Sequence, residues 1–253
     1  MEYHGAITTT GRDTDMETTR LTKPEAMIFD MDGTLFKTET LLIPVYHRLF
    51  DQLREEKLYT GDTPPEERIL GGLGMLLDDI WKRVLPEHDV TVHRRADELL
   101  LELELVGLKE YVTELYPHVL ETLRQLQERG VRLFVASNGL EHYVKEVANT
   151  HGIYSLFEGI YSAGEHQTSS KVDLVKLLLD NHGVNCAWMI GDRSSDVEAG
   201  KENGQTVIGC AYAGFGQGQE LDGADKLISS FAELVALYDQ AVDFSDQREA
   251  AKP

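Results

Sequence analysis

The chain has 253 residues, enough for one large α/β domain, or for a core domain with a smaller insertion, and for a sizeable buried core. Its formal net charge of −20 comes from 44 acidic and 24 basic residues, which argues against binding to nucleic acid or to an anionic membrane surface. No apolar run approaches the roughly 20 residues that span a bilayer, and the N-terminus lacks an apolar signal core. Cys186 and Cys210 have no metal-ligand spacing, so we expect free thiols and a cytoplasmic protein.

Both ends of the chain are polar. Residues 1–24 are rich in threonine, poor in apolar side chains and without periodicity, and they end directly before the first apolar run. We therefore predict an N-terminal tail over 1–24, with an extension that covers a functional site as the alternative. Residues 239–253 are predicted to be a polar C-terminal extension.

The first apolar run ends in two carboxylates, in the sequence Ala-Met-Ile-Phe-Asp-Met-Asp-Gly-Thr-Leu over residues 26–35. Met27 to Phe29 have the length and apolarity of a central parallel strand, and Asp30 falls at its carboxyl end, where open α/β sheets bind their ligands. Asp30 and Asp32 would repel each other unless they share a proton or a cation lies between them. A Mg²⁺ site would resolve this conflict. The alternative is an acidic turn on the surface.

Residues 37–116 interrupt the alternation of strands and helices with a run of helical patterns. One apolar stripe consists of Leu41, Leu42, Val45, Leu49 and Leu53. Further helices are predicted at 76–81 and about 96–105. The glycine-rich stretch 71–74 is either a flexible loop for closure over a site or an ordinary helix connection.

The α/β pattern then resumes with an amphipathic helix over 117–129 and an apolar strand over 131–136. This strand leads into Ser137-Asn138-Gly139, with a helix from about residue 141. A hydroxyl and exposed backbone N–H groups at a strand end can bind an anion. The same residues could instead form a turn or a helix cap.

A lysine opens the next helix. After a short strand over 159–163 and a polar loop over 164–170, Lys171 begins the helix 172–182. The helix dipole disfavours a cation at this end, so we expect an anion beside Lys171.

A second acidic strand end follows. The strand over 187–190 continues into Gly-Asp-Arg-Ser-Ser-Asp, which places Asp192 at the strand end and Asp196 on the following helix turn. Two further strands are predicted at 206–212 and 226–228.

These four motifs, in this order, resemble those of the haloacid dehalogenase superfamily, most closely its phosphoglycolate-phosphatase-like branch. The resemblance covers about residues 25–238 and implies an α/β fold with a three-layer, Rossmann-like parallel sheet core. The core would comprise 25–36 and 117–238. Residues 37–116 would form an inserted helical cap that closes over the substrate.

The resemblance also implies catalytic roles. Asp30 would attack phosphorus and become an aspartyl phosphate. Asp32 would protonate the departing alkoxide and then activate the water that hydrolyses the intermediate. Ser137, Asn138 and Lys171 would bind the phosphoryl oxygens.

The metal site is likewise implied by the resemblance. Mg²⁺ would be held by Asp30, the Asp32 carbonyl and Asp192, while Asp196 would orient waters around it. Dehalogenases lack the second aspartate of the first motif, and phosphonatases carry a small residue there, so Asp32 favours phosphate-ester chemistry.

We accordingly predict a Mg²⁺-dependent phosphatase that hydrolyses a small phosphate monoester, such as phosphoglycolate, a nucleotide or a sugar phosphate. One alternative is a sugar-phosphate mutase of the same superfamily. The other is a non-catalytic scaffold that senses phosphate or binds a partner. The sequence indicates no oligomeric state.

Overall fold

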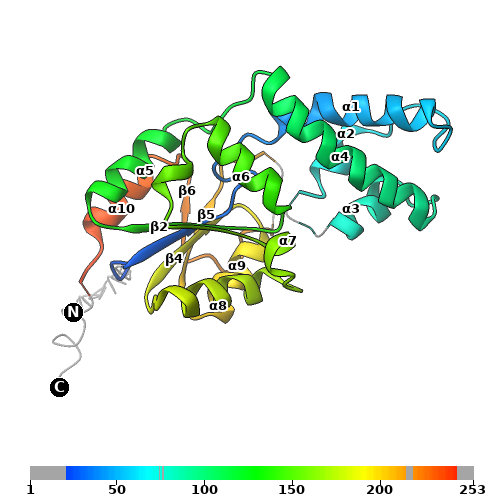
Figure 1. Ribbon diagram of the computed structural model, residues 1–253. Coiled ribbons are helices and arrows are strands. Elements are labelled where there is room, and N and C mark those ends of the chain that lie inside the picture. The colour runs from blue at the N-terminus through cyan, green and yellow to red at the C-terminus, as the bar shows by residue number, and fades with distance from the viewer. Residues whose placement is uncertain (1–20, 74, 76, 215–218, 244–253) are drawn as a thin grey trace, which may run out of the picture.

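The computed structural model describes residues 21–73, 75, 77–214 and 219–243, and its core is a parallel six-stranded sheet in the order β3-β2-β1-β4-β5-β6 (Figure 1). The strands are β1 (Ala26–Phe29), β2 (Arg132–Ser137), β3 (Gly159–Ser162), β4 (Ala187–Gly191), β5 (Thr206–Cys210) and β6 (Lys226–Ile228). Because β1 lies between β2 and β4, the strands that lead to Asp30, Ser137 and Asp192 are neighbours.

Helices cover both faces of this sheet. One face carries α5 (Val119–Glu128), α6 (Glu141–Thr150) and α10 (Glu233–Gln240), and the other carries α8 (Lys171–His182) and α9 (Ser194–Glu202) (Figure 1). The turns η1 (Tyr154–Leu156) and α7 (Ala163–His166) flank β3. The predicted three-layer, Rossmann-like α/β core is confirmed.

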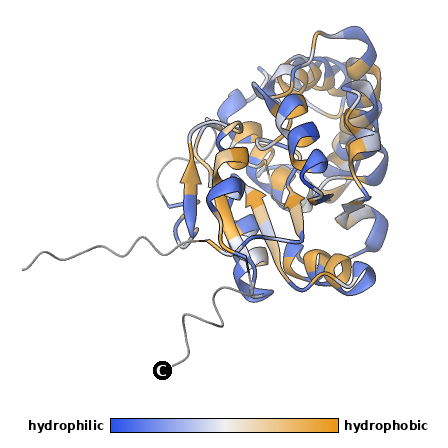
Figure 2. Ribbon diagram, turned by 90° about the vertical axis from the view of Figure 1, so that its left-hand side faces the viewer, coloured by the Kyte–Doolittle hydropathy of each residue, from blue (hydrophilic) through white to orange (hydrophobic). Residues whose placement is uncertain are grey.

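The two helical layers explain why β1 is apolar throughout. Met27 and Phe29 face the core cluster that includes α5, α6 and α10, whereas Ala26 and Ile28 face the cluster that includes α8 and α9. All four side chains are fully buried. A strand covered on both faces needs a continuous apolar sequence, and Figure 2 shows such orange strands enclosed between the helices.

Four helices between β1 and α5 form a separate helical unit, which we call the cap: α1 (Glu39–Glu55), α2 (Glu66–Leu70), α3 (Leu77–Val84) and α4 (Val90–Glu110). The apolar stripe predicted for the first of these is buried along α1, against α4. Helix α4 also packs on α6 of the core, which joins the two parts (Figure 1). In the described part of the chain no helix combines the length and the apolarity that a bilayer span requires.

Some element boundaries differ from those predicted. The helix predicted at 96–105 begins earlier, because the Asp89 side chain accepts hydrogen bonds from the N–H groups of Thr91 and Val92 and caps it. The loop predicted over 164–170 contains α7, whose N-terminal N–H of Glu165 is capped by Ser162.

The prediction of a tail over 1–24 is wrong for residues 21–24, whereas residues 1–20 lie outside the described part of the chain. Thr22 pairs in parallel with Val242, whose N–H donates to the Leu21 carbonyl at 3.0 Å. The Trp188 indole N–H donates to the Thr22 carbonyl at 2.9 Å. The described part of the predicted extension, 239–243, begins inside α10, so residues 21–24 and 239–243 both pack on the core.

We predict that removing residues 1–24 destabilises the protein, whereas removing only 1–20 does not. The longer deletion removes the hydrogen bonds to Trp188 and Val242 and the burial of Leu21, together worth about 2 kcal/mol of unfolding free energy. Thermal melts of the two truncated proteins beside the full chain measure the difference. Equal melting temperatures for both deletions would contradict the packing described for this segment.

Candidate active site

The predicted site residues meet at the carboxyl ends of the central strands. Asp30 directly follows β1, Ser137 is the last residue of β2, and Asp192 directly follows β4. Lys171 and Asp196 reach the same place from the first turns of α8 and α9. The sheet order thus brings together residues that are as much as 166 positions apart.

Three buried carboxylates form the centre of the site. One oxygen each from Asp30, Asp192 and Asp196 lies within 4.8 Å of the others, and the residues are only 4%, 3% and 1% exposed. Gly33 permits this approach: its φ is +80°, and a Cβ there would lie 2.5 Å from an Asp192 carboxylate oxygen. A Cβ at Gly191 would lie closer still to the Asp196 carboxyl group. Larger residues at these two positions would force the acidic loops apart.

The anion expected beside Lys171 is a pair of carboxylates. Its Nζ donates to Asp30 Oδ1 and Asp196 Oδ1, each at 2.5 Å, and all three side chains are buried. Burial lowers the pKa of Lys171, but Asp196 and Asp30 together outweigh it and raise that pKa above its ordinary value. Lys171 is therefore a fixed positive charge at neutral pH.

One lysine does not balance the acidic charge. Burial raises the pKa of Asp30 to about 7, with Asp196 and Asp32 adding to the shift and Lys171 opposing it. Burial, followed by Asp30 and Asp196, also raises the pKa of Asp192 well above its ordinary value. A buried, oxygen-only set of ligands with surplus negative charge fits a hard divalent cation such as Mg²⁺. Asp196 was expected to orient waters around the metal. Its carboxylate lies close enough to those of Asp30 and Asp192 to bind the same ion directly.

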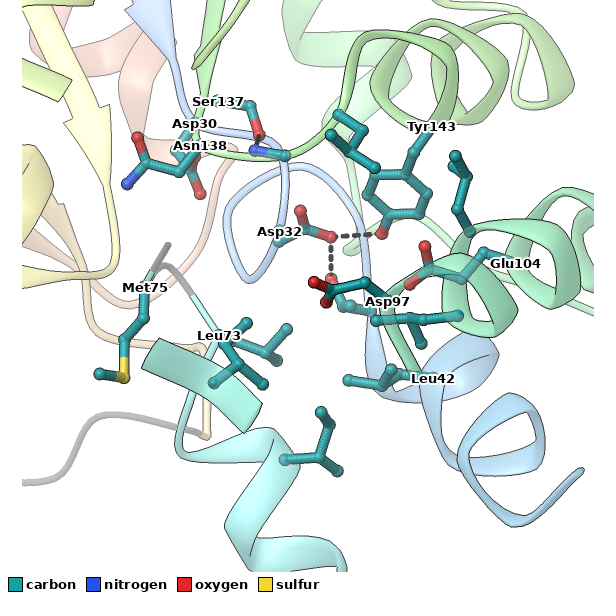
Figure 3. A pocket seen from close by; sticks show the side chains of 17 residues that line it. Asp30, Asp32, Leu42, Leu73, Met75, Asp97, Glu104, Ser137, Asn138 and Tyr143 are labelled. Atoms are coloured by element: carbon teal, nitrogen blue, oxygen red, sulfur yellow. Dashed lines mark hydrogen bonds between the residues drawn. The ribbon is translucent and has the colours of Figure 1, made fainter. Parts of the chain in front are cut away.

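The Asp32 carboxylate is held apart from this cluster. Its Oδ1 accepts hydrogen bonds from the Thr38 hydroxyl at 2.7 Å and the Tyr143 hydroxyl at 2.6 Å (Figure 3). Burial raises the pKa of Asp32, and the two hydrogen bonds partly oppose that effect. A carboxyl that keeps its proton more readily than usual, beside a nucleophilic carboxylate, is suited to general acid catalysis.

Ser137 and Asn138 line the same cavity as Asp30 and Asp32. The Ser137 hydroxyl oxygen accepts a hydrogen bond from the Gly139 N–H at 3.1 Å, so it has the turn geometry considered as the alternative. Its own proton can still be donated to a ligand. The turn and the anion site are therefore compatible.

The cavity lies between the cap and the carboxyl ends of the strands (Figure 3). Its apolar lining from the cap consists of Leu42, Ile69, Leu73, Met75, Ile80, Leu100 and Leu101. Asp97 and Glu104 of α4 add two carboxylates to this side. A substrate with its phosphoryl group at Asp30 would therefore place the rest of the molecule against the cap.

Several site residues were not predicted from the sequence. Thr34 donates to Asp192 at 3.2 Å, and Thr38 and Tyr143 hold Asp32. The position of Tyr143 at the start of α6, just after the Ser-Asn-Gly motif, was the available signal. Glu104 follows Leu100 and Leu101 at helical spacing, so a carboxylate on the apolar face of α4 was another such signal.

Comparisons with known proteins place this chain in one family. A family model described as haloacid dehalogenase-like hydrolase matches residues 24–204, so the chain belongs to the haloacid dehalogenase-like hydrolases. A phosphoglycolate phosphatase from Aquifex aeolicus is 30% identical over 181 residues, which are 70% of this chain and 80% of that protein. The pyrophosphatase PpaX from Listeria monocytogenes is 27% identical over 198 residues, covering 76% and 85% of the two chains.

Solved structures agree on the fold. CbbY from Rhodobacter sphaeroides, in complex with phosphate, superposes with a TM-score of 0.73 at 24% identity over 85% of this chain and 99% of that chain. The predicted superfamily, its phosphoglycolate-phosphatase-like branch and the prediction of an enzyme are confirmed.

We predict that Tyr143→Phe moves the basic limb of the kcat/KM pH profile for an alkyl phosphate to higher pH. The Tyr143 hydrogen bond lowers the pKa of Asp32, so without it Asp32 keeps its proton to higher pH. The profile is measured by phosphate release, with Tyr154→Phe, an exposed tyrosine on η1, as the matched control. An unmoved basic limb would show that Tyr143 does not control the acid.

Proposed function

We propose that the chain is a Mg²⁺-dependent phosphatase that hydrolyses a small phosphate monoester through an aspartyl phosphate on Asp30. The observation that carries the proposal is the position of Asp30 at the end of β1, with Lys171 at 2.5 Å and Asp32 in the same cavity. The names of the relatives differ in substrate but share the cleavage of a bond to a phosphoryl group, which supports this reaction class.

The metal would be held by Asp30, Asp192 and the Asp32 carbonyl, and Asp196 lies close enough to contribute. When bound, Mg²⁺ supplies positive charge that offsets the carboxylates and the phosphoryl oxygens. Lys171 supplies the permanent positive charge of the site, while Ser137 and Asn138 supply hydrogen-bond donors.

In the first half-reaction, an Asp30 carboxylate oxygen forms a bond to phosphorus as the bond from phosphorus to the leaving oxygen breaks. Asp32, as the carboxylic acid, gives its proton to that leaving oxygen, so that an alcohol departs. Thr38 and Tyr143 hold the Asp32 carboxyl in position through the hydrogen bonds described above.

In the second half-reaction, Asp32 is a carboxylate and takes a proton from water. The water oxygen bonds to phosphorus, and the bond between phosphorus and Asp30 breaks. This step releases inorganic phosphate and restores both the Asp30 carboxylate and the Asp32 acid. The complete cycle consumes one water molecule per ester.

We predict that Asp32→Asn lowers kcat/KM far more for an alkyl phosphate than for p-nitrophenyl phosphate. An alkoxide needs a proton as it leaves, whereas p-nitrophenolate does not, so the losses should be on the order of 100-fold and less than tenfold, respectively. Both rates come from initial phosphate release at low substrate concentration. Equal losses, with chemistry shown to limit the rate, would leave Asp32 a structural residue.

We also predict that Mg²⁺ raises the melting temperature of metal-free protein and that EDTA stops phosphate release. Binding to the native carboxylates stabilises the folded state, since the unfolded chain has no such site. Asp192→Asn should reduce the Mg²⁺-induced shift, whereas Asp222→Asn, on the surface, should not. Full activity in metal-stripped buffer would contradict the proposed cofactor.

A further inference from the structure

The cavity has an uneven distribution of charge. Asp30 and Asp32 lie on its phosphoryl side, and Asp97 and Glu104 of α4 lie on the side where the leaving group would be placed. Among the described residues that line it, none is a lysine, arginine or histidine. The leaving-group side is thus apolar and acidic.

Glu104 is the acidic residue there without a protein partner. Asp97 accepts a hydrogen bond from the Trp81 indole N–H, whereas the Glu104 carboxylate has no hydrogen bond or ion pair within the described part of the chain. Figure 3 shows it pointing into the cavity, on the same side as Tyr143 and Asp32. Burial, and then Asp32, raise the pKa of Glu104 well above its ordinary value, so a positive charge beside Glu104 would be needed to favour its ionised form.

The nearest basic side chains of the core are directed elsewhere. Lys171 is held between Asp30 and Asp196. Arg193 donates to the Leu70 carbonyl at 3.3 Å and lies 3.5 Å from Asp192. Neither of these two side chains lines the cavity.

None of the described basic side chains of the cap lines the cavity either. Arg68 donates to the Val84 carbonyl at 3.3 Å, and Arg48 pairs with Glu110 at 2.9 Å. Neither one lines the cavity. An anionic leaving group would meet no positive charge at Glu104.

We propose that Glu104 selects phosphate monoesters whose leaving alcohol carries a hydrogen-bond donor, best a protonated amine, and rejects those whose leaving group is itself an anion. This inference rests on the proposed phosphatase function and specifies its substrate class. An ammonium group would give the Glu104 carboxylate the partner that the protein does not supply. A carboxylate would instead be brought beside Asp97, Asp32 and Glu104 in a cavity that no described basic side chain lines.

Four phosphate esters of nearly equal size can test this selection. Phosphoglycolate, 2-aminoethyl phosphate, 2-hydroxyethyl phosphate and ethyl phosphate differ mainly in the group at the end of a two-carbon chain. Close like charges disfavour binding and close opposite charges favour it, so the order of kcat/KM should be amino, hydroxyl, methyl and then carboxylate. We expect the amino and carboxylate esters to differ on the order of 100-fold.

The experiment measures kcat/KM for these four esters, by phosphate release, in the full chain with Mg²⁺. In Glu104→Gln, which keeps the shape and removes the charge, the ratio of the amino ester to the carboxylate ester should fall at least tenfold. Glu102→Gln is the matched control, because Glu102 lies on the exposed side of the same helix and should leave that ratio unchanged.

p-Nitrophenyl phosphate distinguishes failure of this inference from failure of the proposed function. If the wild-type chain releases phosphate from p-nitrophenyl phosphate but prefers phosphoglycolate to the amino ester, selection by Glu104 is overturned and the phosphatase stands. The same holds if Glu104→Gln leaves the ratio unchanged. If the wild-type chain releases phosphate from none of the five esters, the proposed function fails, and with it this inference.

Discussion

The structure depends on the burial of three carboxylates around a single lysine. Each unpaired ion in a protein interior costs several kcal/mol, and Lys171 can neutralise only part of the charge of Asp30, Asp192 and Asp196. This cost falls at the carboxyl ends of β1 and β4, two strands whose side chains are apolar and buried. Such a site is poorly suited to stabilising the fold and well suited to binding a cation and a phosphoryl group.

The remaining elements position this charge. The parallel order of β2, β1 and β4 sets the three strand ends side by side, and Gly33 lets the loop after β1 approach Asp192. The cap supplies a different environment on the opposite side of the substrate cavity, because α4 presents apolar side chains together with Asp97 and Glu104. On the proposed function, the core would determine the reaction and the cap would determine which ester can approach.

The core was predictable because its signals are local in the sequence. An apolar run that ends in an acidic residue indicates both a buried strand and its ligand-binding end, and this holds at Asp30 and Asp192 alike. Lys171 was predictable because a cation at a helix N-terminus requires a nearby anion. The sequence did not reveal that Asp196 shares that lysine, since the contact forms only when α8 and α9 pack together.

Other features depend on tertiary contacts alone. The hydrogen bond from Tyr143 to Asp32 joins residues 111 positions apart, and no periodicity predicts it. The cap residue Glu104 can be assigned to the cavity only from the tertiary structure, because its helical spacing from Leu100 and Leu101 does not show what α4 faces. The pairing of Thr22 with Val242 was missed because backbone hydrogen bonds hold this polar segment against the core. Such bonds form without apolar side chains and leave no hydrophobic pattern in the sequence.

The central claim is that Asp30 forms a covalent bond to phosphorus, and trapping that bond tests it most directly. The protein is mixed with substrate and Mg²⁺, quenched in acid within a single turnover, and examined by mass spectrometry of its peptides. The account predicts one added phosphoryl group on the peptide that contains Asp30, absent from Asp30→Asn. Phosphate release at the normal rate by Asp30→Asn, or a phosphoryl group trapped on another residue, would contradict it.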